Sequence, residues 1–119
     1  MKAQGTWDDV VVVVASEFGR TLASNGQGTD HGWGGVAYAA GGDIDGGKVL
    51  GRYPADITDD GPLTLSNGRL IPSTPWEGLW LGIAQWFTGE TAASTLAAVL
   101  PNLANFGDDQ RITRADLFK

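Results

Sequence analysis

The sequence contains no cysteine and only one histidine, His31. The lack of cysteine excludes disulfides and thiolate metal sites, and one histidine excludes a three-histidine metal site within the chain. The longest wholly apolar run, Val10–Ala15, is far shorter than the ~20 residues that a membrane-spanning helix needs. The first nine residues lack the apolar segment of a signal peptide, so we expect this chain on its own to stay in the cytoplasm by default.

Basic residues are also few, with 8 lysines and arginines against 14 acidic residues and a net charge of −6. No basic cluster stands out, which argues against nucleic acid as a partner. The 119 residues, 42% of them hydrophobic, fit a single domain spanning 1–119. The 18 glycines indicate extensive loops, and the 5 tryptophans need a core, a partner surface or a ligand to cover them.

The Val10–Ala15 segment contains five consecutive valines, which favour a β-strand. Its apolar residues do not alternate with polar ones, so we expect an interior strand of a parallel sheet that is covered on both faces. Few other segments are able to supply its neighbours, which suggests that the chain is part of a larger sheet. Ligands of α/β sheets bind beyond the carboxyl ends of strands, and the predicted Ser16–Thr21 turn occupies that place.

Further strands are predicted at Val36–Ala40 and Lys48–Tyr53, and Asn67-Gly68 predicts a type I′ hairpin between residues 63–65 and 69–71. Two helices are expected next, at residues 74–88 and 91–100, followed by a short turn at residues 113–118. The first should begin with Thr74 as the N-cap in a capping box with Glu77, and it should end at Gly89. Its apolar stripe is predicted to comprise Trp76, Leu79, Trp80, Ile83 and Phe87.

His31 follows Asp30 in a glycine-rich segment that we expect to be a loop. An imidazole there suits a metal ligand or a general acid/base, with a simple loop hydrogen bond as the alternative. Glu17 could act as a metal ligand or base, and Arg20 could clamp a phosphate- or sulfate-like anion, unless the two pair with each other. A metal here would need carboxylates such as Glu17, Asp30 or Asp43.

Several motifs together resemble a known family. They are residues 12–21 (Val-Val-Val-Ala-Ser-Glu-Phe-Gly-Arg-Thr), Asn25-Gly26, residues 28–32 (Gly-Thr-Asp-His-Gly), and the glycines at 46, 47 and 51 before Pro54. The combination resembles the C-terminal region of the DUF1501 family, which is similar to the alkaline phosphatase and sulfatase superfamily. The likeness extends through the predicted helix at residues 74–87 and the segment at residues 102–106.

The resemblance implies an α/β fold, in which this chain is the C-terminal fragment of an alkaline phosphatase/sulfatase-like α/β sandwich. That sandwich has a mainly parallel sheet. In this chain the fragment also includes the predicted β-hairpin and the two predicted helices. The resemblance also implies a divalent metal (zinc, calcium or magnesium), with Glu17, Asp30 and His31 as metal ligands and His31 and Arg20 as catalytic residues. One departure is Phe18, which stands where a second histidine is expected.

The resulting hypothesis is the C-terminal part of a metal-dependent hydrolase of phosphate or sulfate esters, inactive when isolated. Its ligand would be a small anionic ester or a sulfated or phosphorylated glycan. The nucleophile would come from an N-terminal half, and that half or a homo-oligomer would cover the core. Full-length relatives are expected to be exported to the periplasm. The alternatives are a non-catalytic glycan- or protein-binding module and a truncated product without independent function.

Overall fold

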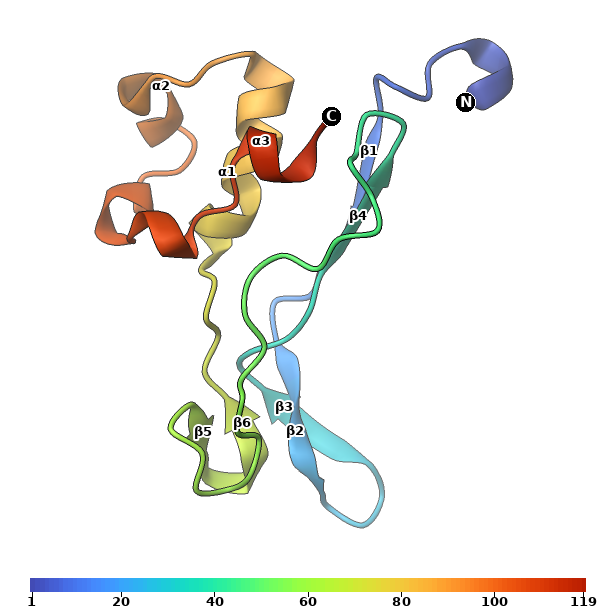
Figure 1. Ribbon diagram of the computed structural model, residues 1–119. Coiled ribbons are helices and arrows are strands. Elements are labelled where there is room, and N and C mark those ends of the chain that lie inside the picture. Colours follow the sequence, from blue (N-terminus) through green and yellow to red (C-terminus); the bar gives the residue numbers. More distant parts are fainter. The chain divides into compact units, whose positions relative to one another are not determined.

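The computed structural model describes residues 1–119, which form two compact units. The helical unit comprises Met1–Val12, Ala40–Gly51 and Thr74–Lys119, and the hairpin unit comprises Val13–Ala39 and Arg52–Ser73. Figure 1 labels the elements. The strands are β1 (Val11–Val14), β2 (Gly19–Ser24), β3 (Thr29–Gly32), β4 (Tyr38–Gly41), β5 (Thr64–Leu65) and β6 (Arg69–Leu70). The α-helices are α1 (Trp76–Thr88), α2 (Ala93–Ala97) and α3 (Arg114–Leu117), and the 3-10 turns are η1 (Lys2–Gln4), η2 (Ser66–Gly68), η3 (Leu103–Asn105) and η4 (Asp108–Gln110).

The strands form three two-stranded sheets, β1 with β4, β2 with β3 and β5 with β6. The last two pairs are antiparallel. The valine run is confirmed as a strand, but its alternate residues Val12 and Val14 are each 44% exposed. The parallel-sheet sandwich stays a prediction about a larger protein. No helix of the chain has both the length and the apolar character needed to cross a membrane.

The predicted hairpin at residues 63–71 is confirmed as β5 and β6. Asn67 and Gly68 both have positive φ, 61° and 69°, as the Asn-Gly signal requires. The strand predicted at Lys48–Tyr53 is wrong, because this segment holds no strand. Its neighbour Gly47 and its own Gly51 have φ of 79° and 80°, a left-handed conformation that interrupts an extended run.

Helix α1 ends at Gly89 as predicted, with a φ of 72° and an N–H that bonds to Gln85 O. Its predicted start is wrong by one residue. Pro75 has an extended conformation and is the N-cap, so Thr74 makes no capping box. The Glu77 carboxylate instead accepts a hydrogen bond from Asn102 Nδ2 at 2.8 Å.

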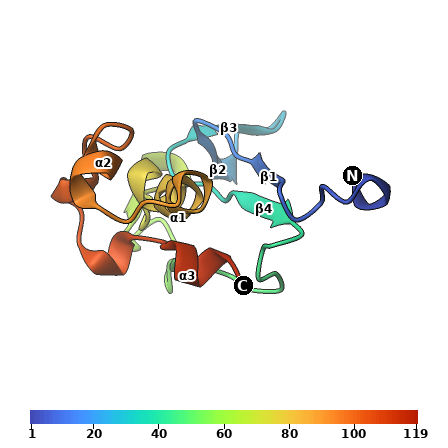
Figure 2. The ribbon, with the colours of Figure 1, turned by 90° about the horizontal axis from the view of Figure 1, so that it is seen from above.

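The predicted apolar stripe of α1 is confirmed at Trp80, which packs against the core, and is wrong at Phe87, which is 82% exposed. The buried residues of the helix are Gly78, Leu81 and Gly82. The glycines leave the helix backbone open, and Ile112 bonds to it directly. Ile112 N–H donates to Gly78 O at 3.0 Å, and Gly82 N–H donates to Ile112 O at 2.8 Å. Helix α3 therefore lies beside α1 in both ribbon views (Figures 1 and 2).

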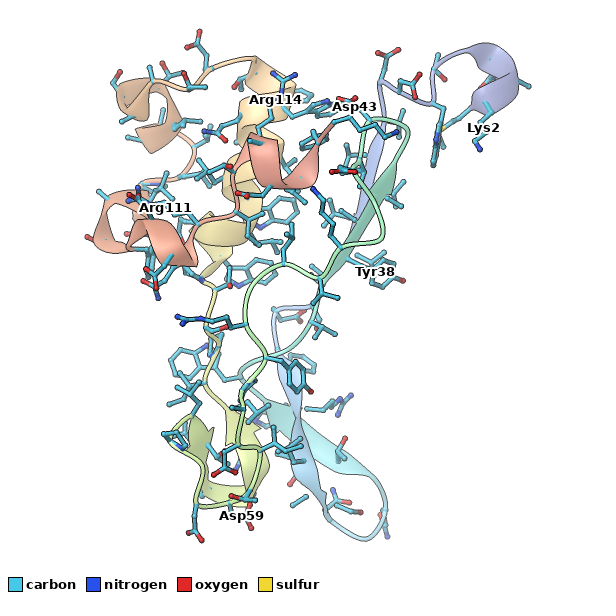
Figure 3. All side chains as sticks on the ribbon, viewed as in Figure 1. Lys2, Tyr38, Asp43, Asp59, Arg111 and Arg114 are labelled. Atoms are coloured by element: carbon cyan, nitrogen blue, oxygen red, sulfur yellow. The ribbon has the colours of Figure 1, made fainter.

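The core of the helical unit consists of leucines from α1, α2 and the turn after it: Leu81, Leu96 and Leu100. The C-terminal residues add a second layer, because Trp86 and Phe118 stack with their ring centroids 5.1 Å apart. Trp86 Nε1 also donates to the Asp43 carboxylate at 3.1 Å (Asp43 is labelled in Figure 3). The buried positions of the hairpin unit are mostly small: Gly19, Thr21, Gly32, Gly61, Gly68 and Leu70. Close backbone packing therefore holds that unit together.

Helix α3 begins with a carboxylate cap. The Thr113 hydroxyl and N–H donate to Asp116 Oδ2 at 2.6 and 2.7 Å. The Thr113 side chain first, and then its N–H, hold the pKa of the Asp116 carboxyl below its ordinary value.

The Asp116→Asn change should lower the free energy of unfolding at pH 7 by about 0.5–1 kcal/mol, the effect of losing a cap. A lowered pKa in the folded state stabilises the protein above the unfolded pKa of about 3.9, and that contribution is lost as the pH falls through the folded value. Urea unfolding at pH 7 and at pH 3 measures this. The difference between Asp116→Asn and the native chain should shrink at pH 3, whereas a control Asp60→Asn change should have little effect at pH 7.

Candidate functional site

The residues singled out for chemistry lie on or next to an antiparallel hairpin, not in the turn and loop that we expected. Strands β2 and β3 pair with Gly19 opposite Gly32 and Arg20 opposite His31. The predicted turn holds for residues 16–18, which lie outside the strands, and is wrong from Gly19 onward. The loop predicted at residues 28–32 is wrong, because Thr29–Gly32 form β3. The glycines suggested loops, but here they allow two backbone segments to approach each other closely. One result is the hydrogen bond that Gly19 N–H donates to Trp33 O at 3.1 Å.

The strand conformation separates Asp30 from His31. Successive side chains of a strand point to opposite faces, and His31 is exposed whereas Asp30 is half-buried. Arg20 lies directly across from His31, so these two side chains share the exposed face. The hairpin therefore brings together the two residues predicted to be catalytic and turns Asp30 to the other side.

Phe18 joins Arg20 and His31 on the exposed face. The Arg20 guanidinium carbon lies 5.5 Å from the centroid of the Phe18 ring. The His31 and Phe18 rings meet edge to face, with centroids 6.3 Å apart and planes at 70°. Arg20 Nη1 donates to Thr29 O at 3.1 Å, which engages one N–H of the guanidinium and leaves its other donors for a ligand.

The opposite face of the hairpin is built around Thr21, which is 4% exposed. Its hydroxyl donates to Ala23 O at 2.9 Å and accepts the N–H of Asp30 at 3.1 Å. The Asp30 carboxylate accepts Asn25 Nδ2 at 2.8 Å. These bonds tie the hairpin end to the strands, so Thr21 and Asn25 hold the site in shape.

The predicted metal ligands do not form one cluster. The chain holds no group of three or more His, Asp or Glu side chains placed to bind a common metal ion. Glu17 is exposed before β2 and accepts a weak hydrogen bond from Ser16 Oγ at 3.5 Å. Arg20 bonds to Thr29 rather than pairing with Glu17. The residues present therefore do not fit a complete metal site, and the metal-binding role of Glu17, Asp30 and His31 stays a prediction.

Sequence reasoning missed Phe18, Thr21 and Asn25 as parts of this site. The signal for Phe18 was available, because residues two apart on a strand share a face and Phe18 precedes Arg20 by two. Thr21 and Asn25 had no such signal. Their roles depend on the pairing of β2 with β3, which a single sequence does not reveal.

One comparison with known proteins gave a match. The model of a family described as "Protein of unknown function (DUF1501)" matches residues 1–65, which include β1 to β5 and all four predicted site residues. No curated protein and no solved structure matches the chain.

Proposed function

This chain belongs to the DUF1501 family of proteins of unknown function, and on that premise we propose that it is the C-terminal part of a hydrolase of phosphate or sulfate esters, similar to sulfatases and alkaline phosphatases. Its own contribution is an anion-binding pair, Arg20 and His31. The observation that carries the proposal is the cross-strand placement of these two side chains on one exposed face.

Arg20 and His31 suit a tetrahedral oxyanion in complementary ways. A guanidinium presents a planar fork of donors that matches two oxygens of a phosphate or sulfate. An imidazole adds a further donor and, when protonated, a second positive charge. Directly opposed residues of an antiparallel pair have Cβ atoms roughly 5 Å apart, so both side chains can reach one anion. In the proposed hydrolase, Arg20 would stabilise the negative charge that develops on the ester oxygens.

The proposed hydrolase also needs a complete set of metal ligands and a nucleophile, which this chain does not bring together. A divalent metal, zinc, calcium or magnesium, is implied by the resemblance, and Glu17, Asp30 and His31 would have to join ligands from outside the chain. The nucleophile would come from outside as well. The 119-residue chain is therefore proposed to bind the anion without hydrolysing its ester.

Titration of the chain with inorganic phosphate tests the proposal. His31 is the only histidine, so its ring signals in the NMR spectrum need no assignment by mutagenesis. Phosphate should shift these signals in a saturable way, while chloride at equal ionic strength should not. Arg20→Gln should weaken the affinity at least about tenfold, since hydrogen bonds to charged groups contribute roughly 1.5–3 kcal/mol and 1.4 kcal/mol is tenfold.

Arg69→Gln is the matched control, because Arg69 also belongs to a hairpin and donates Nη1 to a backbone oxygen, that of Ser66. The affinity for phosphate should be unchanged in this variant. If Arg20→Gln and Arg69→Gln weakened the affinity equally, the binding would be general charge attraction, and this would contradict the proposal. The lack of any saturable shift in the native chain would contradict it as well.

A second candidate is a non-catalytic glycan-binding module, favoured by exposed aromatic rings of the hairpin unit. Trp33 is 59% exposed, Tyr53 68% and Tyr38 66%. Figure 3 shows the Tyr38 side chain pointing away from the ribbon. Such rings can stack on sugars. Binding of neutral oligosaccharides that is lost in Trp33→Ala and kept in Arg20→Gln would favour this candidate over the hydrolase.

A further inference from the structure

Phe18 is placed to hold both members of the Arg20–His31 pair. We propose that Phe18 is a positioning residue of the anion site, which fixes the Arg20 guanidinium and the His31 ring before the anion arrives. The inference rests on the proposed function of that pair. Phe18 itself has no group that could bind an anion, so it acts through its two neighbours.

The Phe18 ring has two polar neighbours. Phe18 is 40% exposed, so burial in a core does not account for it. Two contacts of its ring are with polar side chains. Arg20 lies 5.5 Å from the ring centroid, and His31 meets the ring at 70°. The negative face of an aromatic ring attracts a cation such as the Arg20 guanidinium. Two aromatic rings that meet edge to face, as those of Phe18 and His31 do, also attract each other.

Arg20 is partly ordered before an anion binds. A free arginine side chain loses up to ~2 kcal/mol of rotamer entropy when a ligand fixes it. Here the guanidinium is held in two ways, by the Phe18 ring and by the hydrogen bond from Nη1 to Thr29 O at 3.1 Å. Part of the ordering is therefore complete before binding, which improves affinity by preorganisation.

His31 depends on Phe18 for the direction of its ring. The backbone of β3 places its Cα opposite that of Arg20 but leaves the ring free to rotate. Edge-to-face contact with Phe18 favours a ring orientation on the same side of the hairpin as the guanidinium. A single aromatic ring thus orders two donors that come from different strands.

Removing the ring tests this. Phe18→Leu should weaken the affinity for inorganic phosphate about two- to fivefold, because the ring no longer orders Arg20 before binding and the strength of an exposed cation–π contact limits that effect to this range. It should also shift the His31 ring signals of the unliganded chain and broaden the rotamers of Arg20. Phe18→Tyr, which keeps the ring, should restore all three properties. Phe18→Met, which keeps most of the volume without a ring, is a second ring-free variant if Phe18→Leu reduces folding.

Phe87→Leu is the control, because Phe87 is an exposed phenylalanine of α1 that belongs to the helical unit. It should leave phosphate binding and the His31 signals unchanged. Absence of saturable phosphate binding by the native chain overturns the proposed function and this inference with it. Equal affinity for phosphate in the native chain and in the ring-free variants overturns this inference but not the proposed function. The same holds if Phe18→Tyr does not restore the native affinity.

Discussion

Gly19→Ala is expected to disrupt the hairpin unit, lowering the free energy of unfolding by about 3 kcal/mol, the upper part of the range for overpacking. A methyl group at residue 19 would overlap the carbonyl of Gly34, with 2.6 Å to its carbon and 3.1 Å to Gly35 N. These neighbours are backbone atoms and have no flexible end that could move aside.

The rest of the hairpin unit restrains Gly34 in turn. Gly34 N–H donates to Leu70 O at 2.6 Å, and a Cβ at Gly34 would itself lie 2.8 Å from that oxygen. Moving Gly34 away from an alanine at residue 19 would therefore disturb its packing against β6. The hydrogen bond from Gly19 N to Trp33 O, at 3.1 Å, would be lost at the same time.

Thermal and urea unfolding of Gly19→Ala measures the effect, and NMR signals of β2 and β3 show whether the hairpin survives. Gly46→Ala is the matched control, since a Cβ at Gly46 would have no atom within 4 Å. Its stability should change by no more than about 0.5 kcal/mol. Because Arg20 and His31 depend on this hairpin, Gly19→Ala should also abolish saturable phosphate binding. Native-like unfolding of Gly19→Ala would contradict the packing described here.

Gly82→Ala should destabilise the helical unit by about 2 kcal/mol, although alanine is the better helix former. In a solvent-facing helix the same change would stabilise by roughly 1 kcal/mol. Here the new methyl group would lie 2.7 Å from Thr113 O and 2.8 Å from Leu117 Cδ1. It would push residues 112–117 away from α1 and break the bond from Gly82 N to Ile112 O.

Unfolding monitored by circular dichroism at 222 nm, together with the total fluorescence of the five tryptophans, to which Trp86 contributes, measures this. Trp86 stacks on Phe118, so separation of the C-terminal segment from α1 should change its emission. Phe87→Ala is a control within the same helix, because Phe87 is 82% exposed and its loss should cost little. A more stable Gly82→Ala variant would mean that helix propensity outweighs the contact with residues 112–117.

The two Gly→Ala changes also mark the limit of single-sequence reasoning. Local signals correctly predicted the β1 strand from its valines, the β5–β6 hairpin from Asn67-Gly68 and the end of α1 at Gly89. Each depends on the conformational preferences of a few neighbouring residues. Gly19 and Gly82 carry no local signal that distinguishes them from loop glycines, because their role is to admit a distant backbone.

The same distinction between local sequence signals and tertiary contacts applies to the candidate site. The sequence by itself singled out the candidate residues, because Glu17 and Arg20 follow the valine strand and Asp30 and His31 lie in a glycine-rich segment. Only the tertiary structure decided which of them meet. Pairing of β2 with β3 sets Arg20 opposite His31, and strand alternation turns Asp30 to the other face. The reason is physical: residue types follow from the chain alone, whereas register depends on backbone hydrogen bonds between segments that the sequence does not label as partners.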